Sequence, residues 1–385
     1  MRKSTTSGGG AKPAKPHPDF PLFPHAAGVW AKKIRGKLHY FGPWSDPAAA
    51  LEKYLDEKDD LLAGRTPRGR RGGLTIKGLG DHFLTHKQDL LDSGELAPRT
   101  FARYRATCQF VADVLGKDRL VEDLRPEDFQ FLRARMAKRW GPVALGNEIQ
   151  IVRSLFRYGV EAELREKAVR FGPAFKKPSA KTLRMTRAAA GPQMFTREEI
   201  LRVLDCSTVN MRAMLLLGIN GALGNTDLGL LPIDAVDIAA GWLDYARSKT
   251  GVPRKIKLWK ETIGAIQAVL AARRLPNDPA DNGLLFIGRH GQSYVGHHKG
   301  YRVTSELNRV LAKAKVTGRN FYDLRRTFQT IAEEAHDLAA VQSIMGHAPA
   351  AGDMSAVYRQ RVSDDRLKAV ADCVRRWLFG SEKTK

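Results

Sequence analysis

The chain has 385 residues, a length that predicts two or three domains rather than one compact unit. Its 64 Lys and Arg residues against 41 Asp and Glu give a formal net charge of +23, and the basic residues are spread along the whole sequence. This charge favours nucleic acid as the partner, because basic side chains that bind phosphates release counterions. A membrane surface, an acidic protein and the absence of any polyanionic partner are the alternatives.

Several classes of protein are excluded by what the sequence lacks. No apolar run approaches the roughly 20 residues that span a bilayer, so we expect a cytoplasmic protein without a membrane partner. The three cysteines, at positions 108, 206 and 373, form no C-x-x-C pair and predict neither disulfides nor a metal site. No Walker loop or G-x-G-x-x-G fingerprint precedes a helix, so no nucleotide or other small-molecule cofactor is expected.

Residues 1–20 are typical of a flexible basic tail, and residues 21–73 predict a small β module followed by a linker. Alternating apolar and basic residues over 29–44 indicate an antiparallel hairpin, and Asp46-Pro47 begins a helix that ends at Gly64. We expect four residues of this helix to pack on the hairpin: Leu51, Tyr54, Leu55 and Leu62. One face of the hairpin would carry basic residues that either contact a DNA groove or are simply solvated: Lys33, Arg35, Lys37 and His39. The Gly, Pro and Arg residues of positions 64–73 form the linker.

Residues 74–170 predict an all-α domain, with helices over 126–139 and 143–160. An apolar stripe at steps of three and four defines another of its helices: Phe101, Tyr104, Cys108, Val111 and Leu115. Four basic residues lie on the helix faces, either solvated or in contact with DNA: Arg103, Arg105, Arg153 and Arg157. Residues 171–194 have no sustained period and are interpreted as a second linker.

Residues 195–385 predict a mostly helical domain with a small antiparallel sheet. A capping box, Thr196 to Glu199, begins its first helix. Further elements follow in order: a helix that ends near 220, strands within 241–257, a helix over 261–274, a strand at Leu284 to Ile287, and helices thereafter, the last over 363–380. The expected fold class is therefore mainly α with small β elements (α+β), built from a hairpin-helix module, an all-α domain and this C-terminal domain.

The segment from Phe321 to Val362 carries a set of residues in a specific order. It contains Tyr322-Asp-Leu-Arg325, then Met345-Gly-His347, then Tyr358. This order resembles the tyrosine recombinase (phage integrase-like) family, which has an H-x-x-R motif, a leucine-glycine-histidine turn and a nucleophilic tyrosine. The family also has a lysine in a β-hairpin, and Lys249, followed by a Thr-Gly turn, is its counterpart here.

The resemblance implies a chemistry that needs no metal, ATP or other cofactor. Breaking a phosphodiester requires a nucleophile held in line, cationic donors for the developing charge, and a proton for the departing oxygen. Tyr358 would attack the phosphate and store its energy as a 3′-phosphotyrosyl bond. Arg325 would clamp the scissile phosphate, His347 would donate a hydrogen bond to it, and Lys249 would protonate the 5′ oxygen.

The resemblance also assigns domains and partners. Residues 21–73 are similar to the AP2-like arm-binding modules of some integrases, 74–170 to their core-binding (SAM-like) domain, and 195–385 to the catalytic domain. The implied partner is double-stranded DNA, on which such proteins assemble as homotetramers. The last helix has Leu367, Val370, Val374 and Trp377 on one stripe, which either packs in its own subunit or docks on a neighbouring subunit of the tetramer.

Two positions depart from the family pattern. The family's first arginine lies in G-L-R-x-x-E-L, and aligning Asp227 with the acidic residue puts Gly224 where the arginine belongs. A replacement could come from the Asn225 amide or from an arginine elsewhere: Arg326, Arg254 or Arg212. Tyr322 stands in place of the histidine of H-x-x-R, and its phenol can still donate a hydrogen bond to phosphate.

These observations support three hypotheses about function. The first is a site-specific recombinase of a mobile element, which cuts and rejoins DNA. The second is a catalytically degenerate relative that binds DNA as an accessory factor or repressor, which Gly224 favours. The third, an RNA-binding or ribosome-associated basic protein, explains the charge but not the ordered motif.

Overall fold

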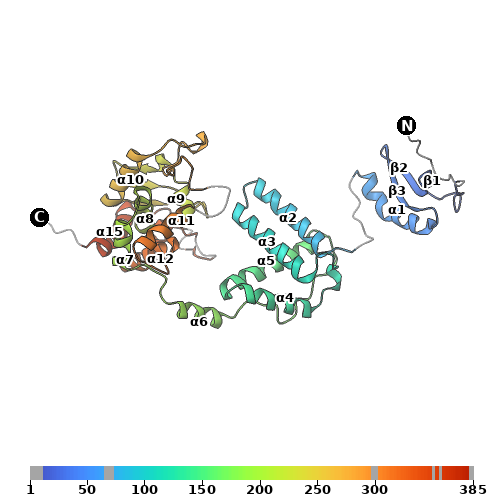
Figure 1. Cartoon of the computed structure of the whole chain (residues 1–385), viewed down its shortest axis with the longest axis horizontal. Helices are drawn as coiled ribbons and strands as arrows, with labels where there is room; N and C mark the ends of the chain where they lie inside the picture. Colours follow the sequence, from blue (N-terminus) through green and yellow to red (C-terminus); the bar gives the residue numbers. More distant parts are fainter. Residues whose placement is uncertain (1–11, 65–72, 296–301, 349–351, 355–357, 381–385) are drawn as a thin grey trace, which may run out of the picture. The chain divides into compact units, whose positions relative to one another are not determined.

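A computed structural model describes residues 12–64, 73–295, 302–348, 352–354 and 358–380 (Figure 1). The chain divides into two compact units, residues 1–189 and 190–385, and each is described here by itself. The described residues form helices and two small three-stranded antiparallel sheets, which confirms the expected mainly α fold class. None of the helices in these described ranges is long and apolar enough to cross a bilayer.

The N-terminal module is a three-stranded sheet in the order β1-β2-β3, followed by one helix. Its elements are β1 (Phe23–His25), β2 (Val29–Ile34), β3 (Lys37–Pro43) and α1 (Pro47–Leu62). Arg35 and Gly36 both have positive φ, at 50° and 81°, and form the two-residue turn of the predicted hairpin. Asp46 caps α1 by accepting a hydrogen bond from the Ala49 amide at 2.9 Å, as Asp-Pro predicts.

The packing of this module corrects two predictions. Leu55 and Leu62 do not face the sheet, since their side chains are 49% and 59% exposed. The apolar face of α1 consists instead of Ala50, Tyr54 and Leu61, with Leu51 partly buried. The register pairs Lys33 with Leu38 and Ile34 with Lys37. Because cross-strand partners project from the same face, Lys33 and Lys37 lie on opposite faces, and the single basic face was wrong.

The second part of the first unit is the predicted all-α domain. Its helices are α2 (Ile76–Asp92), α3 (Pro98–Leu115), α4 (Pro126–Arg139) and α5 (Pro142–Glu161). Proline begins α3, α4 and α5, where a missing amide N–H costs nothing. The predicted linker is partly ordered: Phe175 is fully buried against this domain, Phe171 packs beside it, and residues Ala180–Ala190 form the exposed helix α6.

The C-terminal unit packs its helices around one apolar core. Its longer helices are α7 (Arg197–Asp205), α8 (Val209–Gly221), α10 (Lys260–Ala272), α11 (Arg302–Lys313), α12 (Phe321–Ala332), α13 (Leu338–Met345) and α15 (Asp364–Phe379). The sheet contains β4 (Val236–Asp237), β5 (Trp242–Asp244) and β6 (Lys255–Lys257). The strand predicted at Leu284 to Ile287 is absent, because these residues form only isolated bridges. Of the apolar stripe on α15, Leu367, Val370 and Val374 are buried in this core, and Trp377 is partly buried against it.

Candidate functional site

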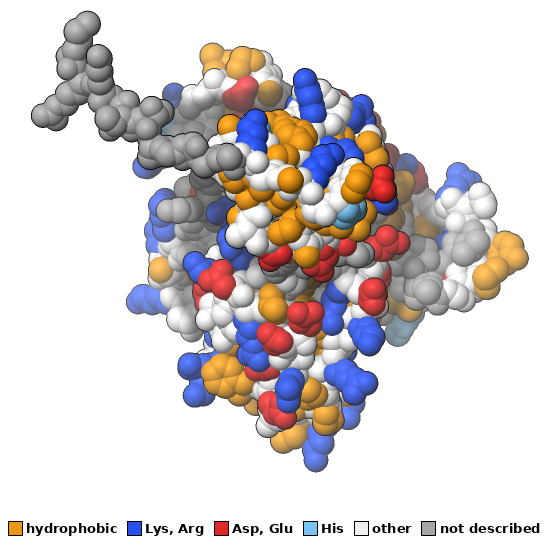
Figure 2. All heavy atoms as spheres, turned by 90° about the vertical axis from the view of Figure 1, so that its right-hand side faces the viewer, with side chains coloured by type: hydrophobic (Ala, Val, Ile, Leu, Met, Phe, Trp, Pro, Cys, Tyr) orange, Lys and Arg blue, Asp and Glu red, His pale blue; other side chains and the backbone are white. Residues whose placement is uncertain are grey.

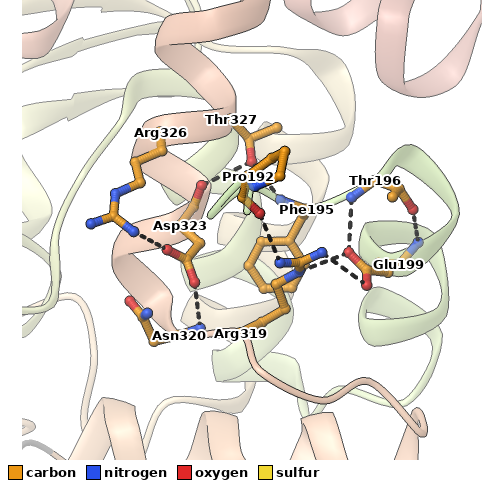
Figure 3. Close-up of polar contacts among 9 residues, drawn as sticks. All are labelled: Pro192, Phe195, Thr196, Glu199, Arg319, Asn320, Asp323, Arg326 and Thr327. Atoms are coloured by element: carbon orange, nitrogen blue, oxygen red, sulfur yellow. Dashed lines mark hydrogen bonds and ion pairs between the residues drawn. The ribbon is translucent and has the colours of Figure 1, made fainter. Parts of the chain in front are cut away.

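Helix α12 is fixed at its first turns by polar contacts that reach α7 (Figure 3). Asn320 caps α12 by accepting from the Tyr322 amide, and Asp323 accepts from the Asn320 amide, both at 2.9 Å. The Thr327 hydroxyl accepts a hydrogen bond from the Phe195 amide at 2.9 Å. An ion pair of 3.0 Å joins Arg319, just before α12, to the Glu199 carboxylate of the α7 capping box. These contacts hold the helix that carries Arg325.

The Arg325 side chain is 3% exposed and joins the ends of two other helices. Its Nη1 donates to the Ala222 carbonyl at the end of α8, and its Nη2 donates to the Met345 carbonyl at the end of α13, both at 2.7 Å. Burial, followed by the charge of Arg247, lowers the pKa of Arg325 to about 10, so the guanidinium is still protonated at neutral pH.

The turn after α13 brings His347 next to Arg325. Gly346 ends α13 in the left-handed conformation, with φ of 60°, and reverses the chain. Burial, then the charges of Arg325 and Arg247, lowers the pKa of the half-buried His347 below its usual value. Its imidazole is therefore neutral at pH 7 and can donate one N–H.

The β5–β6 hairpin is held against the same turn. Inside the hairpin, the Arg247 amide donates to the Val252 carbonyl at 2.9 Å. The Thr250 hydroxyl and Arg247 Nη1 both donate to the Gly346 carbonyl, at 3.1 and 3.3 Å. Lys249 lies exposed in the turn between them. The predicted hairpin is thus confirmed, and it adds Arg247, which sequence reasoning missed although it precedes Lys249 by two residues.

Gly224 is not required by the backbone. Its φ is −98°, and a Cβ at this position would meet only the Asp227 carboxylate, at 3.8 Å. It precedes the short helix α9 (Asn225–Gly229), and its amide donates to Asp227 Oδ2 at 3.1 Å. A Cβ is accommodated at this position, so the backbone does not require glycine there.

The residues considered as replacements for the missing arginine make other contacts. The side-chain amide of Asn225 donates from Nδ2 to the Thr304 hydroxyl of α11 at 2.9 Å. Arg254 is buried in an ion pair with Asp227 of 3.3 Å, which helps to lower the pKa of that carboxyl. Arg326 pairs with Asp323 at 2.8 Å, and exposed Arg212 donates to the Leu204 carbonyl.

The two tyrosines of the motif are both accessible. Tyr322 is 54% exposed at the start of α12, and its hydroxyl is close enough to influence the pKa of Arg325. Tyr358 is 74% exposed. No hydrogen bond within the described ranges joins Tyr358 to Arg325 or His347. The structure therefore gathers the arginine, the histidine and the lysine hairpin, and leaves the tyrosine hydroxyl free to solvent.

Most of the basic residues proposed to bind DNA are exposed: Lys33, Arg35, Lys37, Arg103, Arg105 and Arg157. Arg103 forms an ion pair of 2.7 Å with buried Glu148, and Arg153 donates to the Phe175 carbonyl and lies over the Phe171 ring. On the face drawn in Figure 2, Lys and Arg side chains alternate with acidic and apolar ones.

Three solved integrase structures are similar in fold to this chain. A lambda integrase tetramer bound to a Holliday junction matches with a TM-score of 0.53 at 14% identity, over 87% of this chain and 97% of that chain. A lambda integrase dimer bound to a COC' core site matches with 0.53 at 14% identity, over 90% and 96%. The Tn1549 transposon integrase, in complex with circular intermediate DNA, matches with 0.54 at 15% identity, over 77% and 99%.

Sequence comparison adds nothing to these matches. No protein-family model matches the chain, and no curated protein matches it. The structural matches show a shared fold.

Proposed function

Because this chain has the tyrosine recombinase fold, we propose that it is a site-specific DNA recombinase of a mobile element, with Tyr358 as its nucleophile. The observation that carries the proposal is the placement of Arg325 and His347 side by side, against the hairpin that carries Lys249. Arg325 and His347 can donate hydrogen bonds to a phosphate, and Lys249 is accessible. On this fold, these three groups suit the attack of a protein side chain on a phosphodiester.

The proposed step is a transesterification. The Tyr358 hydroxyl loses its proton to water and attacks the scissile phosphorus, the bond from phosphorus to the 5′ oxygen breaks, and a 3′-phosphotyrosyl ester forms. Arg325 neutralises the developing charge on the non-bridging oxygens, since three of its five N–H donors are not used by Ala222 and Met345. Lys249 gives a proton to the departing 5′ oxygen. Attack by a 5′-hydroxyl reverses the step and rejoins the strand.

Double-stranded DNA is the proposed partner, bound by the assembled protein as a homotetramer. The lambda integrase of similar fold was solved as a tetramer bound to a Holliday junction, which supports this assembly. The exposed basic residues of the first unit supply phosphate contacts: Lys33, Arg35, Lys37, Arg105 and Arg157. Arg103 and Arg153 position helices instead, because their guanidinium groups are held by Glu148 and Phe175.

A second candidate function is DNA binding without cleavage. It is favoured by Gly224, which removes one cation from the family's site, and by the Asn225 amide, which is directed to Thr304 instead. Loss of one hydrogen-bond donor to a transition-state oxyanion typically costs about 3–4 kcal/mol. The two candidates therefore differ in whether a covalent intermediate forms.

Covalent trapping distinguishes them. The wild-type chain, Tyr358→Phe and a control, Tyr40→Phe, are incubated with nicked duplexes drawn from the DNA that flanks the gene. Tyr40 is an exposed tyrosine of the N-terminal module and has no part in the proposed site. We expect an adduct that resists denaturation from the wild type and Tyr40→Phe, and none from Tyr358→Phe. If no adduct forms although the proteins bind these duplexes specifically, the binding-only function is correct.

A further inference from the structure

We propose that Arg247, on the β5–β6 hairpin, supplies the second phosphate-clamping cation that Gly224 cannot provide. This inference rests on the proposed strand cleavage and names a residue outside the family's motif positions. The sequence alone gives Arg247 no prominence, because an arginine in a hairpin is usually solvated.

The first argument is position. Arg247 Nη1 donates to the Gly346 carbonyl at 3.3 Å, and Arg325 Nη2 donates to the Met345 carbonyl at 2.7 Å. The two guanidinium groups thus bond the carbonyls of consecutive residues, immediately before His347. A group that accepts hydrogen bonds from Arg325 and His347 lies within reach of Arg247 as well.

The second argument is the rigidity of the hairpin that carries Arg247. The Arg247 amide donates to the Val252 carbonyl, and the Arg247 carbonyl accepts from the amides of Thr250 and Gly251, at 3.1 and 2.8 Å. Ser248 follows directly and donates to Asp227 Oδ1 from both its amide and its hydroxyl, at 3.2 and 2.7 Å. The hairpin is therefore tied to α9, the helix that begins after Gly224. The backbone of Arg247 is preorganised, which a transition-state donor requires.

The third argument is uncompensated charge. Among the described residues, Arg247 and Arg325 have no carboxylate within ion-pair distance, whereas Arg254 pairs with Asp227 and Arg326 with Asp323. Two arginines held close together without a carboxylate repel each other, and the charge of Arg247 lowers the pKa of both Arg325 and His347. A bound phosphate relieves this repulsion, because its negative charge faces both cations.

The test measures adduct formation and DNA affinity separately on the same nicked duplexes. The variants are Arg247→Gln, Arg247→Lys and the double variant Gly224→Arg with Arg247→Gln. The control is Arg274→Gln, which removes the charge of an exposed arginine that follows α10. We expect Arg247→Gln to slow adduct formation by about 100-fold or more, while Kd changes by less than about tenfold.

The other variants sharpen the assignment. Arg247→Lys should react at an intermediate rate, because lysine keeps the charge and loses the fork of donors. The added arginine at Gly224 should restore at least about tenfold of the rate, since a Cβ at this position would meet only the Asp227 carboxylate, at 3.8 Å. Arg274→Gln should react within about threefold of the wild type.

The outcomes separate this inference from the proposed function. If the wild type forms the adduct and Arg247→Gln forms it within about threefold of the same rate, Arg247 is not the second cation and the recombinase function stands. If the wild type forms no adduct with duplexes that it binds, both proposals fail. A histidine titration by NMR checks folding and placement: the pKa of His347 should rise in Arg247→Gln, and an unchanged pKa would overturn the placement.

Discussion

At the scale of single residues, the site divides charge and hydrogen bonding between different groups. Arg325 and Arg247 carry positive charge at the end of α13, while burial and both arginines keep the adjacent His347 neutral. A neutral imidazole adds a donor without a third positive charge. In the proposed function, the imidazole would donate a hydrogen bond to the phosphate without adding to the repulsion between the two arginines.

His347 should make the C-terminal unit less stable in mild acid. Its pKa is lowered in the folded state, so the unfolded chain binds a proton more readily as the pH falls below the usual value of 6.5. The contribution to stability is fully present above pH 6.5 and is lost as the pH falls through the folded pKa. Scanning calorimetry at about pH 7.5 and about pH 5.5 should show a larger drop in Tm for the wild type than for His347→Gln.

The matched control is His290→Gln, because that histidine is exposed and lies outside the candidate site. It should keep the full pH dependence of the wild type. Equal pH dependence in the wild type and His347→Gln would show that His347 is not a half-buried residue next to the charges of Arg325 and Arg247.

The sequence identified part of this site and missed part of it. Arg325, His347 and the Lys249 hairpin follow from motif order, and the structure brings them together. Arg247 could not be identified, because its role depends on contact with Gly346, almost one hundred positions further along the chain. Asn225 and Arg254 looked available from the sequence, yet the structure engages them with Thr304 and Asp227.

At the scale of elements, the close approach of the hairpin to α13 depends on Gly346. A Cβ at this residue would lie 2.7 Å from Cδ and 2.8 Å from Cγ of Arg254, and 3.0 Å from Cβ of Arg247. These contacts are shorter than van der Waals separation, so the hairpin would have to move away. Glycine here serves both the left-handed turn and the packing of two arginine stems.

Substituting Gly346 should therefore be more costly than substituting a glycine that only has positive φ. Gly318 is the matched control, since its φ is +70° and a Cβ there would meet nothing within 4 Å. Gly318→Ala should cost about 1–2 kcal/mol of folding free energy through left-handed strain alone. Gly346→Ala should cost at least about 1 kcal/mol more through overpacking. Calorimetry of the full chain measures both, and equal losses would contradict this packing.

Elements with local signals were predictable, and elements without them were not. Pro126 and the capping box from Thr196 to Glu199 predicted the starts of α4 and α7, and the structure confirms both. Within the apolar run Leu284 to Ile287, the last three residues are buried, but the run forms only isolated bridges, since burial alone does not pair backbones. Phe175 completes the all-α core from a segment with no periodicity, which no local pattern reveals.

At the scale of the whole molecule, the two units have separate apolar cores and share an excess of basic residues. The core of residues 190–385 contains no residue of the first unit, and the N-terminal module and the all-α domain each have their own cluster. In the proposed function, the N-terminal module, the all-α domain and the C-terminal unit can each contact DNA. Their binding free energies then combine because linkers join them in one chain.

DNA affinity should fall steeply with salt, and the N-terminal module should account for part of the slope. A protein with 6–10 phosphate contacts loses roughly 10³–10⁵ in affinity between 50 and 200 mM salt. Deleting residues 1–73 should flatten the salt slope and weaken binding to sites distal to the cut more than to the cut site. Deleting residues 1–11 is the control for the tail charge. If the larger deletion leaves every footprint unchanged, the module does not bind DNA.

The hydrogen bonds of Arg325 to the carbonyls of Ala222 and Met345 give this residue a structural role that does not depend on DNA cleavage. A lineage that stopped cutting DNA would still be selected to keep Arg325, because losing it would leave the ends of α8 and α13 without their donor. Lys249 and Tyr358 have no such role, since both side chains are exposed and could drift without damage to the fold. Lys249 and Tyr358 therefore bear more directly on the proposed strand cleavage than Arg325 does.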